Sequence, residues 1–327
     1  MRIGWQSIVA CAVLASVVGC GSGGGSQANG SQPGDTGKEI TMGFSQVGAE
    51  SGWRAANTVS IRTAAKDAGI DLKFDDAQQK QENQIKAVKG FIAQGVDVIA
   101  FSPGVTTGWQ PVLEEAKKAK IPVILSDRRA DVPDDLYVTF IGGDFVKEGE
   151  RVGEWLANAT KGKAGIAEIL GTPGSAPAND RHKGFGDAIK KFPGMKVLIA
   201  QTGDFTRSGG KQVMEAFLKG DKASQITAVF AHNDDMALGA IQAMKEAGKK
   251  PGKDILVVSI DGEKDMLEAI ANGDANYCVE CNPMLGPLVM QAAKDILAGK
   301  TLPKRTVVAD EAFDAKNAAA KASSRQY

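Results

Sequence analysis

The sequence lacks an excess of charge of either sign, because lysine plus arginine and aspartate plus glutamate each number 39 in 327 residues. Nucleic-acid-binding proteins usually carry a dominant basic face, so this balance gives no indication of a DNA or RNA partner. Cysteine is also scarce, with Cys11 and Cys20 near the start and Cys278 and Cys281 near the end. This distribution does not predict a disulfide framework.

Recognisable catalytic and metal-binding motifs are lacking as well. The sequence has no Gly-x-Ser-x-Gly elbow, no phosphate loop and no readable catalytic triad. His182 and His232 are the only histidines, and no Cys, Asp or Glu stands near either at a spacing that identifies a metal site. Cys278 and Cys281 form a C-x-x-C pair without a helix start that would lower a thiol pKa, so redox chemistry is not predicted, although an exported pair could oxidise. We therefore expect no catalysis, metal or cofactor.

The first 20 residues have the pattern of a secretory signal, with an apolar core at 8–18 that is too short to span a membrane. Val17-Val18-Gly19-Cys20 resembles a lipobox, which predicts a lipoprotein signal at 1–20 and a lipid on Cys20. The alternative is an ordinary signal peptide with an incidental cysteine. Residues 21–38, rich in Gly and Ser, are predicted to be a flexible tether. Either interpretation predicts an exported protein.

Short apolar runs then alternate with amphipathic stretches, as in a parallel sheet covered by helices on both faces. The first series predicts strands at 40–44, 71–74, 96–101, 122–125 and 137–141, and helices at 53–68, 79–94 and 109–119. After a helix at 145–159, the second series predicts strands at 164–170, 196–201, 228–231, 255–260 and 275–279, and helices at 181–191, 207–219, 235–246 and 264–272. Two similar series predict an α/β protein with two similar lobes.

Polar and aromatic side chains follow the predicted strands in both series. Trp53 and Arg54 open a helical pattern after the first strand, where an open parallel sheet binds ligands. A flat aromatic ring beside a guanidinium suits a ligand with an apolar face and a hydroxyl edge, which describes a sugar. The alternative is that Trp53 packs the helix onto the sheet and Arg54 is solvated. Asp127 and Asp261 also stand at strand ends, so the two sheet edges are expected to enclose a cleft.

The chain resembles the ribose-binding-protein-like family of periplasmic sugar-binding components of ABC transporters over about residues 39–310. Within that family its motifs are most similar to those of galactofuranose-binding members. The motifs are 44–48 (FSQVG), 50–54 (ESGWR), 79–84 (QKQENQ), 203–207 (GDFTR) and 231–236 (AHNDDM). A generic ribose binder is expected to carry a pair of aromatics where this chain has Trp53 and Arg54.

The resemblance implies two doubly wound parallel-sheet lobes joined by a three-crossing hinge. The N-terminal lobe would take 39–143 plus 281–307, and the C-terminal lobe 144–280 plus 308–322. The crossings would lie near Gly142-Gly143, near Glu280 and near Val307-Val308. Glycine at the first crossing is expected because a hinge must absorb a change of backbone dihedrals.

The resemblance also implies a set of ligand-binding residues. Arg128 is expected to orient the Asp127 carboxylate and to donate to the sugar ring. The Asp127-Arg128 pair matches a family pair that contacts the sugar, and the alternative is an exposed surface ion pair. Phe205 is expected to form an aromatic wall opposite Trp53, or else to lie in the core. Asp234 and Asp235 are expected to serve a helix start as N-cap and first-turn acids. The full predicted set is Ser45, Glu50, Trp53, Arg54, Asp127, Arg128, Arg181, Phe205, Asn233, Asp261 and Glu280.

The resulting hypothesis is a monomeric lipoprotein that captures a monosaccharide, expected to be galactofuranose or a related furanose, and delivers it to the permease of an ABC importer. An exported sugar sensor that reports to a chemoreceptor or sensor kinase fits the same features. A sugar-responsive transcription regulator would need a helix-turn-helix where the signal sequence stands. An exported carbohydrate enzyme would need an acid–base pair that the sequence does not reveal.

Overall fold

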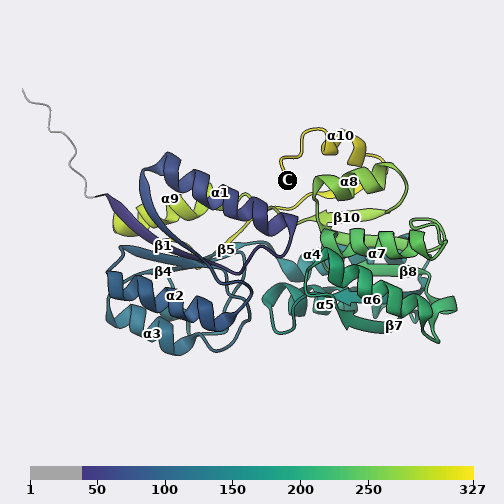
Figure 1. The fold of residues 1–327 in the computed structure, drawn as a ribbon, viewed down its shortest axis with the longest axis horizontal. Helices are drawn as coiled ribbons and strands as arrows, with labels where there is room; N and C mark the ends of the chain where they lie inside the picture. Colours follow the sequence, from purple (N-terminus) through teal and green to yellow (C-terminus); the bar gives the residue numbers. More distant parts are fainter. Residues whose placement is uncertain (1–38) are drawn as a thin grey trace, which may run out of the picture. The chain divides into compact units, whose positions relative to one another are not determined.

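The computed structural model describes residues 39–327, which form one compact unit. The predicted signal at 1–20, its lipidated Cys20 and the tether at 21–38 lie outside the described residues. From residue 39 onward, no helix is both long and apolar enough to cross a membrane. Figure 1 shows two α/β lobes side by side along the long axis of this unit.

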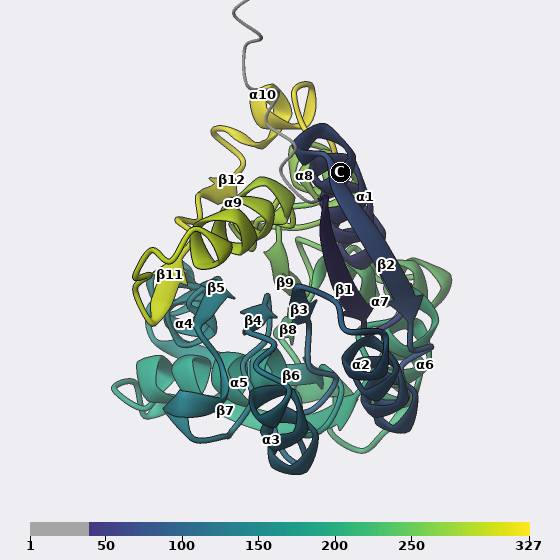
Figure 2. The same cartoon turned by 90° about the vertical axis from the view of Figure 1, so that its left-hand side faces the viewer.

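The first lobe contains a six-stranded sheet in the order β11-β5-β4-β3-β1-β2, with every neighbouring pair parallel. Helices α1 and α9 cover one face and α2 and α3 the other (Figure 2). The strands are β1 (Ile40–Gln46), β2 (Ile70–Asp76), β3 (Val98–Phe101), β4 (Val123–Ser126), β5 (Thr139–Gly142) and β11 (Arg305–Val307). The helices are α1 (Gly52–Ala68), α2 (Gln81–Gln94), α3 (Gln110–Lys118), η1 (Asp134–Leu136) and α9 (Gly286–Leu297).

Strand β3 shows how the sequence specifies this three-layer arrangement. Val98 and Ala100 pack toward α1 and α9, whereas Ile99 and Phe101 pack toward α2 and α3. All four side chains are fully buried. A parallel strand covered on both faces is apolar at every position, because successive side chains point to opposite faces.

The second lobe repeats this plan with the order β12-β10-β9-β8-β6-β7, in which only the β10–β12 pair is antiparallel. Helices α4 and α5 cover one face, and α6, α7, α8 and α10 lie over the other. The strands are β6 (Lys163–Leu170), β7 (Gly194–Thr202), β8 (Ala228–Ala231), β9 (Leu256–Asp261), β10 (Tyr277–Glu280) and β12 (Ala312–Asp314). The helices are α4 (Phe145–Ala159), α5 (Ala176–Ile189), α6 (Arg207–Lys219), η2 (Ala223–Gln225), α7 (Asp234–Glu246), α8 (Lys264–Ala271) and α10 (Ala318–Ala322).

The two lobes therefore share one strand order, β2-β1-β3-β4-β5 in the first and β7-β6-β8-β9-β10 in the second. This is a doubly wound order in which ligands bind beyond the carboxyl ends of the strands, where the order reverses. The predicted two-lobed α/β fold is confirmed. The chain changes sheets between β5 and β6, between β10 and β11, and between β11 and β12. The residue boundaries assigned to the lobes stay predictions.

The starts of α5 and α7 differ from the sequence predictions for reasons that the structure shows. Helix α5 begins at Ala176 rather than 181, because the Ser175 side chain caps it and Pro177 occupies its first turn. Proline fits there since the first helical N–H groups have no intrahelical acceptor. The N-cap of α7 is Asn233, whose side-chain oxygen accepts from the Met236 N–H, so assigning that role to Asp234 was wrong.

The two glycines at the first crossing, Gly142 and Gly143, lie where other groups approach their backbone closely. Neither Gly142 nor Gly143 has a positive φ. A Cβ atom on Gly142 would lie 2.6 Å from the Asp127 carbonyl oxygen, and one on Gly143 would lie 2.6 Å from Oε1 of Glu148. Gly142 therefore requires glycine because a backbone carbonyl approaches it, whereas at Gly143 the close atom is the end of the Glu148 side chain. The hinge role expected of both glycines stays a prediction.

Candidate functional site

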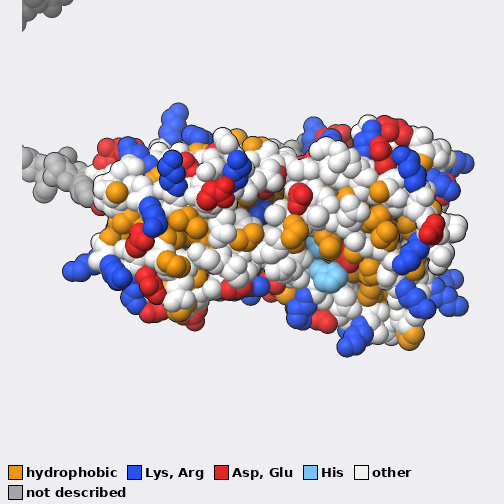
Figure 3. Space-filling model, turned by 60° about the horizontal axis from the view of Figure 1, so that its bottom comes forward, with side chains coloured by type: hydrophobic (Ala, Val, Ile, Leu, Met, Phe, Trp, Pro, Cys, Tyr) orange, Lys and Arg blue, Asp and Glu red, His pale blue; other side chains and the backbone are white. Residues whose placement is uncertain are grey.

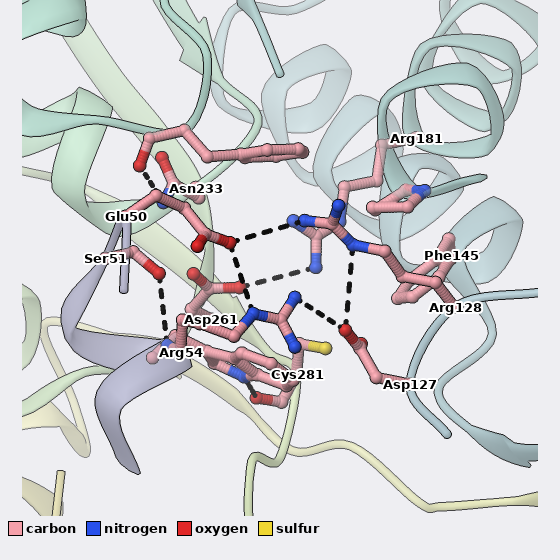
Figure 4. A pocket seen from close by; sticks show the side chains of 13 residues that line it. Glu50, Ser51, Arg54, Asp127, Arg128, Phe145, Arg181, Asn233, Asp261 and Cys281 are labelled. Atoms are coloured by element: carbon pink, nitrogen blue, oxygen red, sulfur yellow. Dashed lines mark hydrogen bonds and ion pairs between the residues drawn. The ribbon is translucent and has the colours of Figure 1, made fainter. Parts of the chain in front are cut away.

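A cavity lies between loops of the two lobes (Figure 4). Its first-lobe residues follow β1 and β4, and the others belong to α4 and α5, follow β7, β8 and β10, or end β9. The lining residues are Glu50, Ser51, Trp53, Arg54, Asp127, Arg128, Phe145, Pro177, Arg181, Phe205, Asn233, Asp261 and Cys281. The structure thus brings together nine of the eleven residues predicted from the sequence.

Helix α1 places the first group of side chains. Ser51 caps the helix by accepting from the Arg54 N–H, and this sets Glu50 just before the helix and Arg54 in its first turn. The Arg54 guanidinium is buried and donates to Glu50 at 3.1 Å and to Asp127 at 2.7 Å. It also stacks 4.6 Å from the centre of the Trp53 ring. Arg54 is therefore held rigidly, and the alternative of a solvated Arg54 was wrong.

Asp127 stands at the carboxyl end of β4 with a φ of 64°. Aspartate tolerates this left-handed conformation better than most residues, and such backbone strain is concentrated at functional sites. Its Oδ2 accepts from Arg54 and, at 3.1 Å, from the Ser102 hydroxyl. All side-chain contacts to Asp127 from residues 39–327 end on Oδ2, which leaves Oδ1 available to a further donor.

Arg128 differs from the expectation that it orients Asp127. Its Nε is 3.7 Å from Asp127 Oδ2, beyond hydrogen-bond distance, and its Nη2 is 3.7 Å from Glu50 Oε1. Its guanidinium instead donates to the Gly104 carbonyl at 3.3 Å and lies 5.3 Å from the centre of the Phe205 ring. Arg54 is therefore the hydrogen-bond partner of Asp127. Arg128, which is buried, reaches across the cavity to the second lobe.

Arg181 provides the guanidinium of the second lobe. It donates to Glu148 at 2.8 Å, to the His232 carbonyl at 2.6 Å and to Asp261 at 3.3 Å. Asn233 uses both ends of its amide, accepting from Met236 N–H and donating to the Phe205 carbonyl at 3.1 Å. These bonds restrict the cavity-lining side chains, and a restricted side chain loses less entropy when a ligand binds.

Aromatic side chains form the apolar part of the lining. Trp53, Phe145 and Phe205 are each 4% exposed. Trp53 comes from the first lobe but packs in an apolar cluster of the second, and its indole N–H donates to the Cys281 carbonyl at 2.5 Å. Phe205 belongs to the second-lobe core and also lines the cavity, so its two predicted placements are both realised.

The lining contains three guanidinium groups and three carboxyl groups, so it carries no large excess of either charge. Burial works against the charged form of Arg54, but Asp127 and Glu50 outweigh it and raise its pKa. Burial and the neighbouring Arg54 instead lower the pKa of Arg128 to about 10. Burial also raises the pKa of the Asp261 carboxyl, against the opposing effect of Arg181.

Two buried polar atoms of the lining have no hydrogen-bond partner among residues 39–327. They are Oε2 of Glu50, an acceptor, and Nε of Arg128, a donor. Buried polar atoms in native proteins are nearly always paired, and each exception calls for an explanation. One acceptor and one donor at the same cavity match a ligand that both donates and accepts hydrogen bonds, as hydroxyl groups do.

Ser45 and Glu280 do not line this cavity. Ser45 is buried within β1, and its hydroxyl has no partner in the described part of the chain. The Glu280 carboxylate accepts from Arg325 at 2.5 Å, from Tyr327 at 2.9 Å and from the Glu311 N–H at 2.9 Å. Neither residue is placed to contact a ligand held in the cavity, so the structure gives no support to these two assignments.

Several residues of the site were not predicted from the sequence, including Ser51, Phe145 and Pro177. Ser51 carried a readable signal, since serine before a helical pattern is a common N-cap. Glu148, whose carboxylate accepts from Arg181, had no such signal in the sequence, because only the packing of α4 against α5 brings Glu148 to the site.

Cys278 and Cys281 are free and buried, and burial raises the pKa of both thiols, which disfavours thiolate chemistry.

Comparison with known proteins places the chain in a family. A family model described as periplasmic binding protein domain matches residues 42–301. The chain is 52% identical to the galactofuranose-binding protein YtfQ of Escherichia coli (strain K12) over 269 residues, which cover 81% of this chain and 85% of the relative.

Two solved structures are similarly close. A Mycobacterium smegmatis protein in complex with β-D-fucofuranose is 56% identical, with a TM-score of 0.83 and coverage of 86% of this chain and 93% of that one. The binding protein of the arabinose ABC transporter from Shewanella sp. ANA-3, bound to L-arabinofuranose, is 51% identical, with a TM-score of 0.86 and coverage of 88% and 96%. The resemblance inferred from the motifs is confirmed, and the chain belongs to the family of periplasmic binding proteins.

Proposed function

We propose that this protein is the substrate-binding component of an ABC sugar importer and that it binds a monosaccharide between its two lobes. The observation that carries the proposal is a cavity lined by Glu50 and Arg128, each with one unpaired buried atom, and by three buried aromatic side chains. Hydroxyl groups would pair with the polar atoms, and a ring face would pack on the aromatics.

We infer that the ligand is a neutral sugar of the galactofuranose type. The equal numbers of guanidinium and carboxyl groups favour a ligand without net charge, since an added charge would meet an unbalanced repulsion. The furanose ring is inferred from the relatives, whose names mention galactofuranose, fucofuranose and arabinofuranose. Arg54, present where a generic ribose binder is expected to have an aromatic, fits the same inference.

Hydrogen bonds between the two lobes support closure of the lobes over the ligand as the binding mechanism. The Gly52 N–H of α1 donates to Asp235 of α7 at 2.7 Å, and the Trp53 N–H donates to Glu263. On another side of the cleft, Arg129 pairs with Asp180 at 3.0 Å. These bonds join the first lobe to the second and would break when the lobes separate. A ligand that contacts both lobes would favour the closed state by its differential affinity.

Export and anchoring complete the proposal. The family is periplasmic, and the signal pattern at 1–20 supports export of a monomeric protein held to a membrane through lipidated Cys20. A lipoprotein on the tether at 21–38 would remain close to its permease while its lobes bind sugar. No cofactor enters this mechanism.

A thermal-shift screen with furanose-forming sugars, ring-locked methyl furanosides and pyranosides, and galacturonate tests the proposed function. Ligand at about 100 times its Kd should stabilise the protein by roughly 2.7 kcal/mol. We expect neutral furanoses to raise Tm more than pyranosides, and galacturonate to raise it least. No shift with any sugar would contradict the proposal, whereas a preference for pyranosides would contradict only the furanose assignment.

A further inference from the structure

Two imidazoles and one carboxylate meet in the second lobe, outside the cavity that the proposed function uses. Glu168 lies in β6, His182 lies in α5 and His232 follows β8. Glu168 and His232 are fully buried, whereas the His182 side chain is 57% exposed. Histidine surface, coloured pale blue, is visible on the face shown in Figure 3. The sequence spacing of 14 and 50 residues hid this group, because only the fold brings its three elements together.

Both imidazoles point at the same carboxylate oxygen. His182 Nδ1 lies 2.9 Å from Glu168 Oε1, and His232 Nε2 lies 3.0 Å from it. The second oxygen, Oε2 of Glu168, is buried and has no hydrogen-bond partner among residues 39–327. A buried carboxylate with one oxygen unpaired is costly, so a cation held at its other oxygen, Oε1, would offset part of that cost.

The spacing of the three ligand atoms suits a tetrahedral metal ion. Metal–ligand bonds of about 2.0–2.2 Å place neighbouring ligand atoms roughly 3.3 Å apart. Two of the three separations here are 2.9 and 3.0 Å, and all three ligand atoms lie within 4.8 Å of one another. The exposed His182 side chain can make the remaining adjustment. Two imidazoles and a carboxylate are a donor set that Zn²⁺ takes in sites with an open fourth position.

We propose that Glu168, His182 and His232 form a binding site for a divalent transition-metal ion of the Zn²⁺ type, with the fourth position open to solvent beside His182. Imidazole nitrogen favours such ions over Mg²⁺ and Ca²⁺, which prefer oxygen ligands. In the structure, which describes no ion, the three groups form a hydrogen-bonded network.

Metal binding must move protons within this network. The Gly171 N–H donates to His232 Nδ1 at 3.4 Å, so Nε2 carries the proton and donates to Glu168. For Nε2 to bind an ion, this proton moves to Nδ1 and the long Gly171 contact opens. The His182 proton likewise moves to its other ring nitrogen. The carboxylate and two neutral imidazoles then bind the ion, a doubly protonated His182 releases its extra proton to solvent, and the Gly171 amide loses its acceptor.

The cluster is connected to the cavity through the backbone. His182 is the neighbour of Arg181, and the His232 carbonyl accepts the 2.6 Å bond from the Arg181 guanidinium. His232 also precedes Asn233, which lines the cavity. A bound ion would therefore change the position of two cavity residues. This coupling rests on the proposed sugar-binding function, whereas metal binding itself does not.

Calorimetric titration of the untagged, chelator-treated protein with ZnCl₂ in a non-coordinating buffer tests the proposal. Wild type should bind one Zn²⁺ per chain. His182→Gln should weaken binding by at least about tenfold, since even outer-shell partners contribute that much. His182 is exposed, so this variant is expected to fold, and an unchanged Tm without metal checks that. Lys183→Gln, on the next exposed residue of α5, is the matched control and should bind Zn²⁺ as wild type does.

A second readout separates this cluster from adventitious binding. Co²⁺ bound by two imidazoles and a carboxylate should give a tetrahedral visible absorption spectrum in wild type and Lys183→Gln but not in His182→Gln. The Gly171 amide resonance should shift on metal addition. Absence of Zn²⁺ binding by wild type would leave a purely hydrogen-bonded network and overturn the proposal. Undiminished binding by His182→Gln would place the ion elsewhere and overturn it as well. Both outcomes are independent of whether any sugar binds.

Discussion

The Arg54 guanidinium donates a 2.7 Å hydrogen bond to the Asp127 carboxylate, and their side chains are only 2% and 5% exposed. This pair joins the first turn of α1 to the end of β4, two segments 73 residues apart. A buried charge depends on its partner, because removing one member leaves the other desolvated and unpaired. The pair is thus a structural element and the polar centre of the proposed sugar site.

Arg54→Phe should shift sugar preference away from galactofuranose, because the guanidinium donors are lost and an aromatic face takes their place. It should also lower the free energy of unfolding by about 3 kcal/mol or more, since buried Asp127 and Glu50 lose their cation. Arg54→Lys, which keeps the charge, should lose less stability. Calorimetry with furanose and pyranose sugars, alongside thermal melts, measures both effects. An unaltered sugar preference in Arg54→Phe would argue against the galactofuranose assignment while leaving sugar binding intact.

Asp235→Ala should weaken sugar binding although Asp235 does not line the cavity. Its carboxylate receives the Gly52 N–H across the lobe boundary, and losing this charge-assisted bond should cost about 1.5 kcal/mol of closure, or roughly tenfold in affinity. Asp265→Ala is the matched control, because Asp265 also pairs with Arg207 but makes no bond between lobes.

Small-angle scattering with and without saturating sugar shows whether the two variants close. The radius of gyration should fall on binding in wild type and Asp265→Ala, and should fall less in Asp235→Ala at the same sugar concentration. Equal affinities and equal scattering for the two variants would mean that the Asp235 bond does not contribute to closure.

Asp310→Asn should flatten the dependence of stability on pH. Burial, with the nearby Glu148 charge, raises the Asp310 pKa to about 8, against roughly 3.9 for an unfolded aspartate. Between these values the native state holds a proton that the unfolded state has released, so stability falls as pH rises. Calorimetric Tm from about pH 5 to about pH 8 should therefore drop more for wild type than for Asp310→Asn. Parallel curves would show that Asp310 titrates normally.

Cys20→Ala should release the protein from the membrane fraction of cells. Lipoprotein cysteines carry more than one acyl chain, and stable attachment needs more than one because a single chain binds only marginally. Membrane fractionation followed by immunoblotting measures the change. If the variant stayed with the membrane as wild type does, Cys20 would not be the anchor.

Local sequence patterns predicted the fold well because strands and helices leave periodic signals. Helices α4 and α6 and strand β8 have the predicted bounds, and each begins or ends at clear apolar or capping residues. Residues that follow strands were also predictable as cavity residues, since the carboxyl ends of parallel strands face the ligand. Asp127 and Phe205 are examples, and both adopt positive φ in the structure.

Side-chain partnerships were less predictable because they depend on packing between distant segments. The sequence suggested that Arg128 would orient Asp127 as its neighbour, whereas Arg54 makes the bond from another element. Glu280 was expected at the ligand, but Arg325 and Tyr327 bind its carboxylate instead. The cluster of Glu168, His182 and His232 was not predicted either, since spacing along the sequence does not show which side chains meet in the fold.

Titration calorimetry of wild type and Asp127→Ala with the best sugar from the thermal-shift screen tests the central claim most directly. Oδ1 of Asp127 is free to accept hydroxyl donors, and bonds to a charged group contribute roughly 1.5 to 3 kcal/mol each. Losing two such hydrogen bonds should cost about 3 kcal/mol or more of binding free energy, which is at least a hundredfold in affinity. Trp53→Ala, which mainly removes apolar contact, should bind more tightly than Asp127→Ala. Loss of detectable binding in a folded Asp127→Ala protein is the predicted result, and wild-type affinity in that variant would contradict a sugar site between the lobes.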